Sequence, residues 1–479
     1  MSIIPRYNQP IKFISLGLAI STFSVFAQPQ LIVPPSEQPI LRTIQSEISA
    51  QRIKQDVSQL VNFGTRHTLS ETKSNTRGIG AARRWIKAEF EKISKQCGNC
   101  LEIIEQKQTF SGEKRIPEPT EVVNIIAIQR GTTDPNRYVI MSGDIDSRVS
   151  DPLDYTSDSP GANDNASGVA GVIEAARVLS KYQFNGSVVY AALSGEEQGL
   201  FGGKIMAAIA KKENWRVEAV LNNDMIGNIE GINGIINNTT ARVFSEGIRY
   251  TETAKEAKMR RFTGGEVDSA SRNLARYVDK MADLYIPNLD VMMVYRLDRF
   301  KRGGHHRPFN QLGFPAVRIM ETNEHYDRQH QNIRVENGRA YGDVLAGVNF
   351  DFAAKLTSLN AVTLASLAWA PAPPANTEIS GAVQPSTTLS WQKPTGKLTK
   401  NLAGYRLYWR LTTEPTWTHS QYVGNVEQFT LKNIVIDNYF FGVASVSKQG
   451  FESPVVFPGP AGSFGGYESL SLPETSIFK

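Results

Sequence analysis

The chain of 479 residues is poor in cysteine, because Cys97 and Cys100 are the only two. They lie in the segment Cys-Gly-Asn-Cys, and no second pair is present to complete a structural zinc site. In a cytosolic protein this spacing would indicate a redox motif or half of a zinc site. In an oxidising compartment it favours a local disulfide between Cys97 and Cys100, which is the interpretation we adopt.

The sequence also lacks a long run of like charges. It contains 52 Lys and Arg against 47 Asp and Glu, which gives a formal net charge of +5. Because the basic residues are spread among nearly as many acidic ones, the composition does not indicate a nucleic-acid-binding protein. We therefore expect no nucleic-acid partner.

No apolar stretch is long enough to cross a bilayer. The run from Phe13 to Phe26 is shorter than the roughly 18–20 residues that a span needs. Arg6 and Lys12 precede this run, and small or aliphatic residues up to Ala27 close it. The pattern predicts a signal peptide over residues 1–27, with a short membrane anchor as the alternative. We expect a secreted or periplasmic protein without a membrane span.

The length of the chain predicts two folded units. Helical periodicity is found at Gln38–Leu60 and Gly80–Lys95, and it returns after residue 168. Nearly continuous apolar segments, typical of strands buried on both faces, alternate with these helices at Val122–Ile128, Tyr138–Ser142, Ser187–Leu193, Val217–Asn222 and Ala316–Met320. This alternation predicts an α/β domain over residues 28–360, with a mainly parallel mixed sheet and helices on both faces.

The composition changes after Ser358. Ala365–Pro374 is rich in alanine and proline, and we place a linker at residues 361–374. Short alternating strands then follow at Thr387–Trp391, Gly404–Arg410, Gln428–Leu431 and Tyr439–Val446. They predict an all-β sandwich over residues 375–462, followed by a C-terminal tail at 463–479.

Acidic residues and histidines follow four of the predicted strands. They are Asp144 and Asp146, then Glu196 and Glu197, then Asp224, and finally Glu321 with His325 and His330 beyond it. Ligands of open α/β sheets bind beyond the carboxyl ends of the strands. A single acidic residue there is usually a helix cap, but so many together would repel one another unless cations lie among them. Carboxylate and imidazole ligands suit zinc, manganese or cobalt, and zinc is our first choice.

Four segments make this pattern specific: Pro160–Gly168, Ser194–Gly202, Asn222–Gly227 and Arg328–Gln331. With them the chain resembles, from about Gln38 to Leu356, the secreted zinc exopeptidases of the bacterial leucyl aminopeptidase, aminopeptidase Y and glutamate carboxypeptidase type.

The resemblance implies two divalent metal ions and a role for each matching residue. Asp164 would bridge the metals, Asp144 and Asp224 would bind the first metal, and Glu197 and His330 would bind the second. His325 competes with His330 for that last role. Glu196 would be the general base, and Asp146 would orient the ligands by hydrogen bonds. His305 and His306 match a segment near the substrate pocket of the family.

One position departs from the family pattern. The family has His-x-Asp where this chain has Asp144-Ile145-Asp146. A carboxylate at position 144 reaches less far than an imidazole and adds a negative charge. We therefore expect a weaker or altered metal preference at the first site, with manganese or cobalt in place of zinc. A single-metal or inactive protein is the alternative.

The C-terminal strands resemble a fibronectin type III domain. Trp391 would be the core tryptophan and Tyr439 the corner tyrosine. The alternative is a β-rich extension packed on the first domain. No catalytic residues are visible here, so we expect a binding, spacing or stabilising role.

The function that the whole sequence predicts is a secreted metal-dependent aminopeptidase with peptide substrates. Carboxypeptidase-type or other amide hydrolysis on the same site is the first alternative, because specificity resides in loops. A catalytically lapsed binding or adhesion protein is the second.

Overall fold

The computed structural model describes residues 31–394 and 399–464. The predicted signal peptide at 1–27 lies outside the described residues, as does most of the predicted C-terminal tail at 463–479. The described residues from Pro34 onward form one compact unit. Within the described residues, no helix is both long enough and apolar enough to span a bilayer.

The bounds of the regular elements are as follows. The helices are α1 (Pro39–Glu47), α2 (Ala50–Val61), α3 (Gly78–Gln96), α4 (Gly168–Leu179), α5 (Glu196–Gly199), α6 (Phe201–Lys212), α7 (Ala254–Thr263), α8 (Ala270–Tyr285), α9 (His306–Gln311) and α10 (Phe350–Trp369). The strands of the large sheet are β1 (Leu101–Phe110), β2 (Thr120–Gln129), β3 (Asp134–Asp144), β4 (Gly186–Leu193), β5 (Arg216–Asn223), β6 (Thr240–Ser245), β7 (Asp290–Val294) and β8 (Ala316–Glu321).

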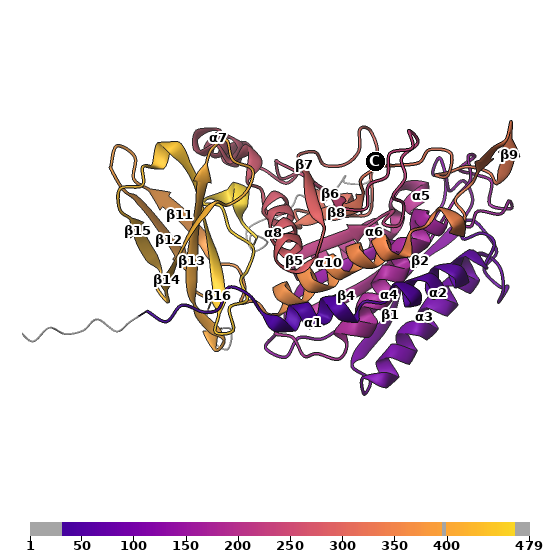
Figure 1. Ribbon diagram of the computed structural model, residues 1–479, viewed down its shortest axis with the longest axis horizontal. Coiled ribbons are helices and arrows are strands. Elements are labelled where there is room, and N and C mark those ends of the chain that lie inside the picture. Colours follow the sequence, from indigo (N-terminus) through magenta and orange to yellow (C-terminus); the bar gives the residue numbers. More distant parts are fainter. Residues whose placement is uncertain (1–30, 395–398, 465–479) are drawn as a thin grey trace, which may run out of the picture. The chain divides into compact units, whose positions relative to one another are not determined.

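The large sheet has the strand order β1-β2-β4-β3-β5-β8-β6-β7 (Figure 1). Its centre is parallel, because β3 pairs in parallel with β4 and β5, and β5 pairs in parallel with β8. The β1–β2, β2–β4 and β6–β8 pairs are antiparallel. A mixed sheet with a parallel centre is what the apolar segments predicted.

Helices cover both faces of this sheet. Val139 and Met141 of β3 point into a large core that they share with α3, α4, α8 and α10. Tyr138 and Ile140, the alternate residues of the strand, point into a second core with α6 and α9. Successive strand residues point to opposite faces, so a strand buried on both sides must be apolar throughout. The α/β fold class is confirmed.

The helix expected at Gln38–Leu60 is two helices, because the chain breaks between α1 and α2 at Ile48 and Ser49. The hydroxyl of Ser49 caps α2 by accepting a hydrogen bond from the Arg52 N–H at 3.2 Å. Its own backbone N–H donates to Glu174 Oε1 of α4 at 2.7 Å. Serine is a favoured N-cap residue because its hydroxyl accepts from a free N–H of the first helical turn. The bond from its own N–H to Glu174 makes the break in the helix possible.

The predicted linker at 361–374 is wrong for its first nine residues. Helix α10 continues to Trp369, and its residues Ala361 to Ala368 are buried. Alanine and leucine favour the helix, and Pro371 restricts the backbone of Ala370 to extended conformations. Ala370 is accordingly extended and ends the helix. The alanine- and proline-rich composition that suggested a linker therefore marks only the C-terminal end of α10.

Two small antiparallel sheets follow α10. Their strands are β11 (Ala375–Ser380), β12 (Thr387–Gln392), β13 (Leu402–Leu411), β14 (His419–Gly424), β15 (Gln428–Leu431) and β16 (Tyr439–Ser447). One sheet has the order β11-β12-β15 and the other β14-β13-β16. Leu389 and Trp391 of the first share a core with Tyr405, Leu407 and further residues of the second. The pair is a β-sandwich.

Buried ion pairs join this sandwich to α8. Glu452 lies 2.7 Å from Lys280 Nζ and accepts a hydrogen bond from Arg406 Nε at 2.7 Å. Asp268, before α8, pairs with Arg410 of β13 and with Arg276 of α8, both at 2.8 Å. The sandwich is thus packed directly on the first domain.

Candidate metal site

The predicted site residues lie at one edge of the large sheet. Asp144 ends β3, Glu196 and Glu197 open α5 directly after β4, and Asp224 follows β5. These three strands are parallel, so their carboxyl ends meet at the same edge. Asp164 joins them from the turn Ala162–Ser167 that precedes α4, in which the backbone of Asp164 and Asn165 is not helical. His330 comes from the loop after β8.

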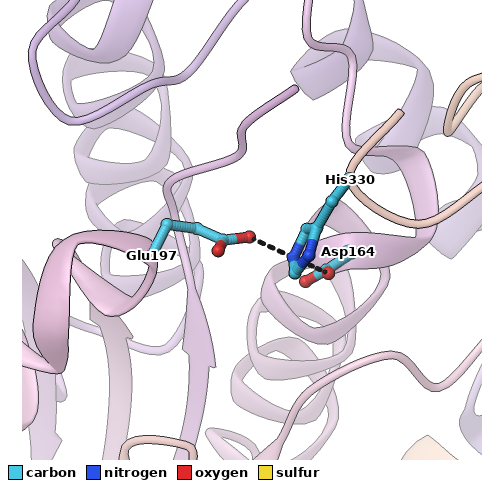
Figure 2. Close-up of side chains that lie close together, drawn as sticks. All are labelled: Asp164, Glu197 and His330. Carbon is cyan, nitrogen blue, oxygen red and sulfur yellow. Dashed lines mark ion pairs between the residues drawn. The ribbon is translucent and has the colours of Figure 1, made fainter. Parts of the chain in front are cut away.

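Asp164, Glu197 and His330 converge on one point (Figure 2). His330 Nε2 lies 3.0 Å from Asp164 Oδ2 and 2.9 Å from Glu197 Oε1. In a tetrahedral zinc site with ligands at about 2.0–2.1 Å, neighbouring ligand atoms are about 3.3 Å apart. The three side chains therefore fit a zinc ion with little movement, and three protein ligands leave the fourth position open, as in catalytic zinc sites. The structure brings His330, and not His325, to the two carboxylates.

Arg148 orients two of these three side chains. Its Nε donates to Glu197 Oε2 at 2.7 Å, and its Nη2 lies 2.7 Å from His330 Nδ1. A guanidinium only donates hydrogen bonds, so Nδ1 accepts and the ring proton is on Nε2. Metal binding at Nε2 would move the ring proton to Nδ1, and the contact between Nδ1 and Arg148 Nη2 would then have to open, because both atoms would be donors. The sequence pattern gave no signal for Arg148.

Asp146 fixes the start of α5. Its Oδ1 accepts from the backbone N–H of Glu196 at 3.1 Å, and its Oδ2 accepts from that of Glu197 at 3.0 Å. Thr68 Oγ1 donates to the same Oδ2 at 3.0 Å. Asp146 therefore acts through the backbone of both glutamates, which is the orienting position that the resemblance implied.

Glu196 lies beside the three converging side chains and lines the same cavity. Burial, together with the negative charges of Asp224 and Glu197, raises the pKa of Glu196 well above its usual range. A carboxyl group with a raised pKa is better suited to take a proton from water and return it.

The turn that carries Asp164 is held by two further acids. Asp343 accepts hydrogen bonds from the backbone N–H groups of Asn163 at 2.9 Å and Asp164 at 2.6 Å. Glu321, which the sequence placed among the acids of the edge, accepts from Asn163 Nδ2 at 2.9 Å and from the Asn228 N–H at 2.8 Å. Glu321 therefore supports the turn. Asp343 belongs to no motif and was not foreseen.

Asp144 is engaged by two side chains. Its Oδ1 lies 2.5 Å from His305 Nδ1, and its Oδ2 accepts from Asn165 Nδ2 at 2.8 Å. Burial raises the pKa of Asp144 to about 8 and lowers the pKa of His305 to about 4. Both shifts favour a pair in which the carboxyl group and the imidazole are uncharged.

His305 and His306 do not line the cavity, contrary to the expectation for substrate-binding residues. Both rings are fully buried. His306 Nε2 lies 2.8 Å from the carbonyl oxygen of Leu297, within its own loop. The loop packs tightly on α6, since a Cβ on Gly203 would lie 2.8 Å from the His305 ring. These contacts turn both histidines inward.

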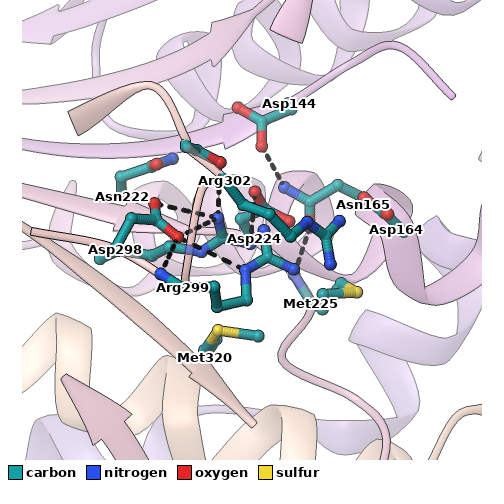
Figure 3. Close-up of polar contacts among 12 residues, drawn as sticks. Asp144, Asp164, Asn165, Asn222, Asp224, Met225, Asp298, Arg299, Arg302 and Met320 are labelled. Atoms are coloured by element: carbon teal, nitrogen blue, oxygen red, sulfur yellow. Dashed lines mark hydrogen bonds and ion pairs between the residues drawn. The ribbon is translucent and has the colours of Figure 1, made fainter. Parts of the chain in front are cut away.

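Asp224 is paired with an arginine that the motifs did not reveal. Arg318 of β8 is fully buried, and its Nη2 lies 2.7 Å from Asp224 Oδ2. Its Nη1 lies 3.2 Å from Asp298 Oδ2 and donates to the carbonyl of Gly303 at 2.8 Å. Figure 3 shows Asp224 and Asp298 together with Asp144 and Asn165 of the same edge. The sequence contains one sign of this ion pair, which is the position of Arg318 inside the apolar segment Ala316–Met320. A buried arginine almost always has an acidic partner.

The predicted first metal site is therefore a poor fit for a cation. A dication on Asp224 Oδ2 would lie roughly 4 Å from Arg318 Nη2, given a metal–oxygen distance of about 2.0 Å. At an effective dielectric constant of about 20, their repulsion is about 8 kcal/mol. Among the described residues, Asp144 and Asp224 join no group of three ligand atoms within 4.8 Å of one another.

A cavity of about 470 Å³ opens onto the three converging side chains. Its acidic residues are Asp164, Glu196, Glu197 and Asp224. Its basic residues are more numerous and comprise Arg115, Arg148, Lys204, Arg299, Lys301, Arg302 and Arg307.

Arg66 holds together the two loops that carry the site. It is buried, and its Nε donates to the carbonyl of Ile145, between Asp144 and Asp146, at 2.8 Å. Its Nη1 donates to the carbonyls of Pro160 and, at 3.2 Å, Leu60, and its Nη2 donates to Gly161 at 2.9 Å. One guanidinium thus fixes the loop after β3 against the turn that bears Asp164.

Comparisons with known proteins show the family of the chain. A family model described as peptidase family M28 matches residues 124–346. A "Probable zinc metalloprotease" of Pyrenophora teres f. teres is 42% identical over 430 residues, covering 89% of this chain and 88% of the relative. Another, from Leptosphaeria maculans, is 41% identical and covers 90% of this chain and 99% of the relative. The LapA aminopeptidase of Legionella pneumophila has the same fold, with a TM-score of 0.51 and 20% identity over 71% of this chain and 77% of that chain.

The fold is that of aminopeptidases of known structure, and the three converging side chains are of the types that bind zinc in metallopeptidases. The chain belongs to peptidase family M28 and is a zinc metalloprotease of that family.

Replacing Arg66 tests its role as the clamp of the two loops. Arg66→Met leaves buried carbonyl groups without donors, and we expect the free energy of unfolding to fall by roughly 3–5 kcal/mol in urea titrations. Arg84→Met is the matched control, because the exposed Arg84 also binds backbone carbonyls, among them that of Thr72 at 2.8 Å. Its loss should cost less than about 1 kcal/mol. Equal losses in the two variants would contradict the clamp.

A second prediction concerns Asp146. In Asp146→Asn one carboxylate oxygen becomes an NH2 group that faces a backbone N–H, so the start of α5 must shift. We expect peptidase kcat/KM to fall about 10–100-fold. Thr68→Val, which removes one donor to Asp146 and leaves both glutamate N–H contacts in place, should lose much less. A kinetic comparison of the two variants with the unaltered protein checks this, and wild-type activity in Asp146→Asn would refute it.

Proposed function

We propose that the protein is a secreted zinc aminopeptidase that uses Glu196 as its general base. The observation that carries the proposal is the convergence of Asp164, Glu197 and His330 next to Glu196, at the open end of a cavity. Secretion is supported by the basic and apolar pattern of residues 1–27 and by the Cys97–Cys100 disulfide, which suits an oxidising compartment.

The chemistry follows from the positions of these side chains. Asp164, Glu197 and His330 would hold a zinc ion, which would supply the Lewis acidity that polarises a carbonyl group and lowers the pKa of a water molecule. Glu196 takes the proton of the attacking water and returns it to the leaving amine. Asp146 keeps Glu196 and Glu197 in register through their backbone N–H groups. Arg148 holds Glu197 from the opposite side.

Two arguments favour cleavage at the amino end of peptides. The LapA structure of the same fold is that of an aminopeptidase. The cavity also contains the carboxyl group of Asp224 near the three ligands, and this group can receive the ammonium group of a peptide N-terminus.

A carboxypeptidase-type activity is the second candidate, and the basic residues of the cavity favour it. Arg115, Lys204, Lys301 and Arg307 line the cavity and form no ion pair with any residue in the described ranges. A peptide C-terminus or an acidic side chain would be attracted to these charges.

The β-sandwich is proposed to be a fibronectin type III domain. The sheets β11-β12-β15 and β14-β13-β16 and the core Trp391 support this assignment. Its contacts with α8 favour a stabilising role.

Replacing the general base tests the mechanism. In Glu196→Gln we expect kcat to fall by about 10²–10⁴-fold, because the amide cannot take a proton from water. The zinc content and the melting temperature should stay as in the unaltered protein, because Glu196 is not one of the three converging ligands. Removing zinc with a chelator should abolish hydrolysis, and adding zinc back should restore it. Hydrolysis that survives in Glu196→Gln at the full rate would overturn the assignment.

Blocked substrates separate the two candidate activities. Peptides with a free N-terminus should be cleaved, and N-acetylation should abolish their cleavage, whereas amidation of the C-terminus should have little effect. The reverse pattern, in which amidation abolishes cleavage, would support the carboxypeptidase-type candidate. A zinc-loaded protein that hydrolyses neither series would be a binding protein.

A further inference from the structure

We infer that the site binds a single zinc ion, and that the guanidinium of Arg318 takes the place of the second metal that the family resemblance predicts. The inference rests on the proposed metal-dependent function for the site at Asp164, Glu197 and His330, and it goes beyond that function by fixing the number of metals. It also gives roles to Arg318 and His305 that no motif assigns.

Three of the four carboxylate oxygens of the first site already contact protein groups. Asp144 Oδ1 contacts His305 Nδ1 at 2.5 Å, and Asp144 Oδ2 accepts from Asn165 Nδ2 at 2.8 Å. Asp224 Oδ2 is paired with Arg318 Nη2 at 2.7 Å. A metal at this position would have to displace an imidazole, an amide and a guanidinium from fully or largely buried positions.

The charges are balanced without a second cation. Burying two carboxylates next to Asp164 and Glu197 would be strongly unfavourable unless positive charge or donors accompanied them. Arg318 supplies one permanent positive charge beside Asp224, and His305 supplies the hydrogen bond to Asp144. Position 144, which is histidine in the family pattern, is thus an aspartate whose partner histidine comes from the loop before α9.

The surrounding chain is shaped to hold Arg318 in this position. Asp298 binds its Nη1 at 3.2 Å, and the carbonyl of Gly303 accepts from the same atom at 2.8 Å. A Cβ on Gly304 would lie 3.0 Å from Asn222 Oδ1 and 3.2 Å from Arg318 Nη1, so a glycine lets the loop approach this closely. The loop between β7 and α9 therefore delivers both Asp298 to Arg318 and His305 to Asp144.

The second site has fewer obstacles, because only the contact between Arg148 Nη2 and His330 Nδ1 would have to open when a metal binds Nε2. Asp164 Oδ2, Glu197 Oε1 and His330 Nε2 face one another, and the basic group beside them, Arg148, contacts the other oxygen of Glu197 and the other nitrogen of His330 (Figure 2). Asp164 would accordingly be a ligand of one metal rather than a bridge between two.

Zinc content per chain tests the inference. The full chain is dialysed against excess zinc, freed of loosely bound metal, and analysed by elemental mass spectrometry against protein concentration. We expect one zinc per chain in the unaltered protein, and two would overturn the inference. Zinc-edge anomalous scattering from crystals should show one peak, among Asp164, Glu197 and His330. A second peak beside Asp224 would also overturn it.

Two matched substitutions make the result specific to each half of the site. Asp224→Asn should keep one zinc, and His330→Ala should keep none. A two-metal protein would instead lose one of its two ions in Asp224→Asn. A thermal melt of each variant, compared with the unaltered protein, establishes that it is folded. Should Asp224→Asn fail to fold, the count and the anomalous peaks of the unaltered protein still decide the question.

The outcome for the metal count is distinguishable from the outcome for the proposed function. One zinc per chain together with no chelator-sensitive hydrolysis would leave the inference standing and remove the peptidase proposal. Two zinc ions together with chelator-sensitive hydrolysis would do the opposite. A protein that binds no zinc at all would overturn both.

Discussion

The structure depends on keeping a group of buried carboxyl groups at one edge of a parallel sheet. Asp144, Asp164, Glu196, Glu197 and Asp224 are brought there by the strands and turns of the central sheet. Water is largely excluded, so each negative charge needs a cation, a proton or several N–H donors close by. Asp146 and Asp343, which lie next to this group, meet the same requirement by accepting hydrogen bonds from backbone N–H groups.

The two halves of this edge meet the constraint in different ways. On one side the carboxylates face an imidazole, and the space among them suits a metal ion. On the other side an arginine offsets the charge of Asp224, and a histidine contacts Asp144. Strand β8, which carries Arg318, is paired with β5. This pairing fixes the backbone of Arg318 beside that of Asn222, two residues before Asp224.

The sequence predicted the centre of the fold well and its edges less well. The buried strands β2, β3, β4, β5 and β8 were found because strands covered on both faces are continuously apolar. Strand β1 was missed, since it is an edge strand with the mixed sequence Leu-Glu-Ile-Ile-Glu-Gln-Lys and partly exposed side chains. The motifs likewise predicted Asp164, Glu197 and His330. The roles of Arg318, Arg148 and Asp298 depend on contacts between segments far apart in the chain, and the spacing of residues within a motif does not show such contacts.

The length of α10 limits how the chain can be divided. Residues 361–368 form its second half and fill the core on one face of the sheet. Arg137 of β3 binds the carbonyls of Leu367 at 2.9 Å and Ala370 at 2.8 Å, just where the helix stops. A recombinant fragment that ended at residue 360 would leave an apolar groove open to solvent, and such grooves promote aggregation. The shortest catalytic fragment worth expressing therefore extends past Ala370.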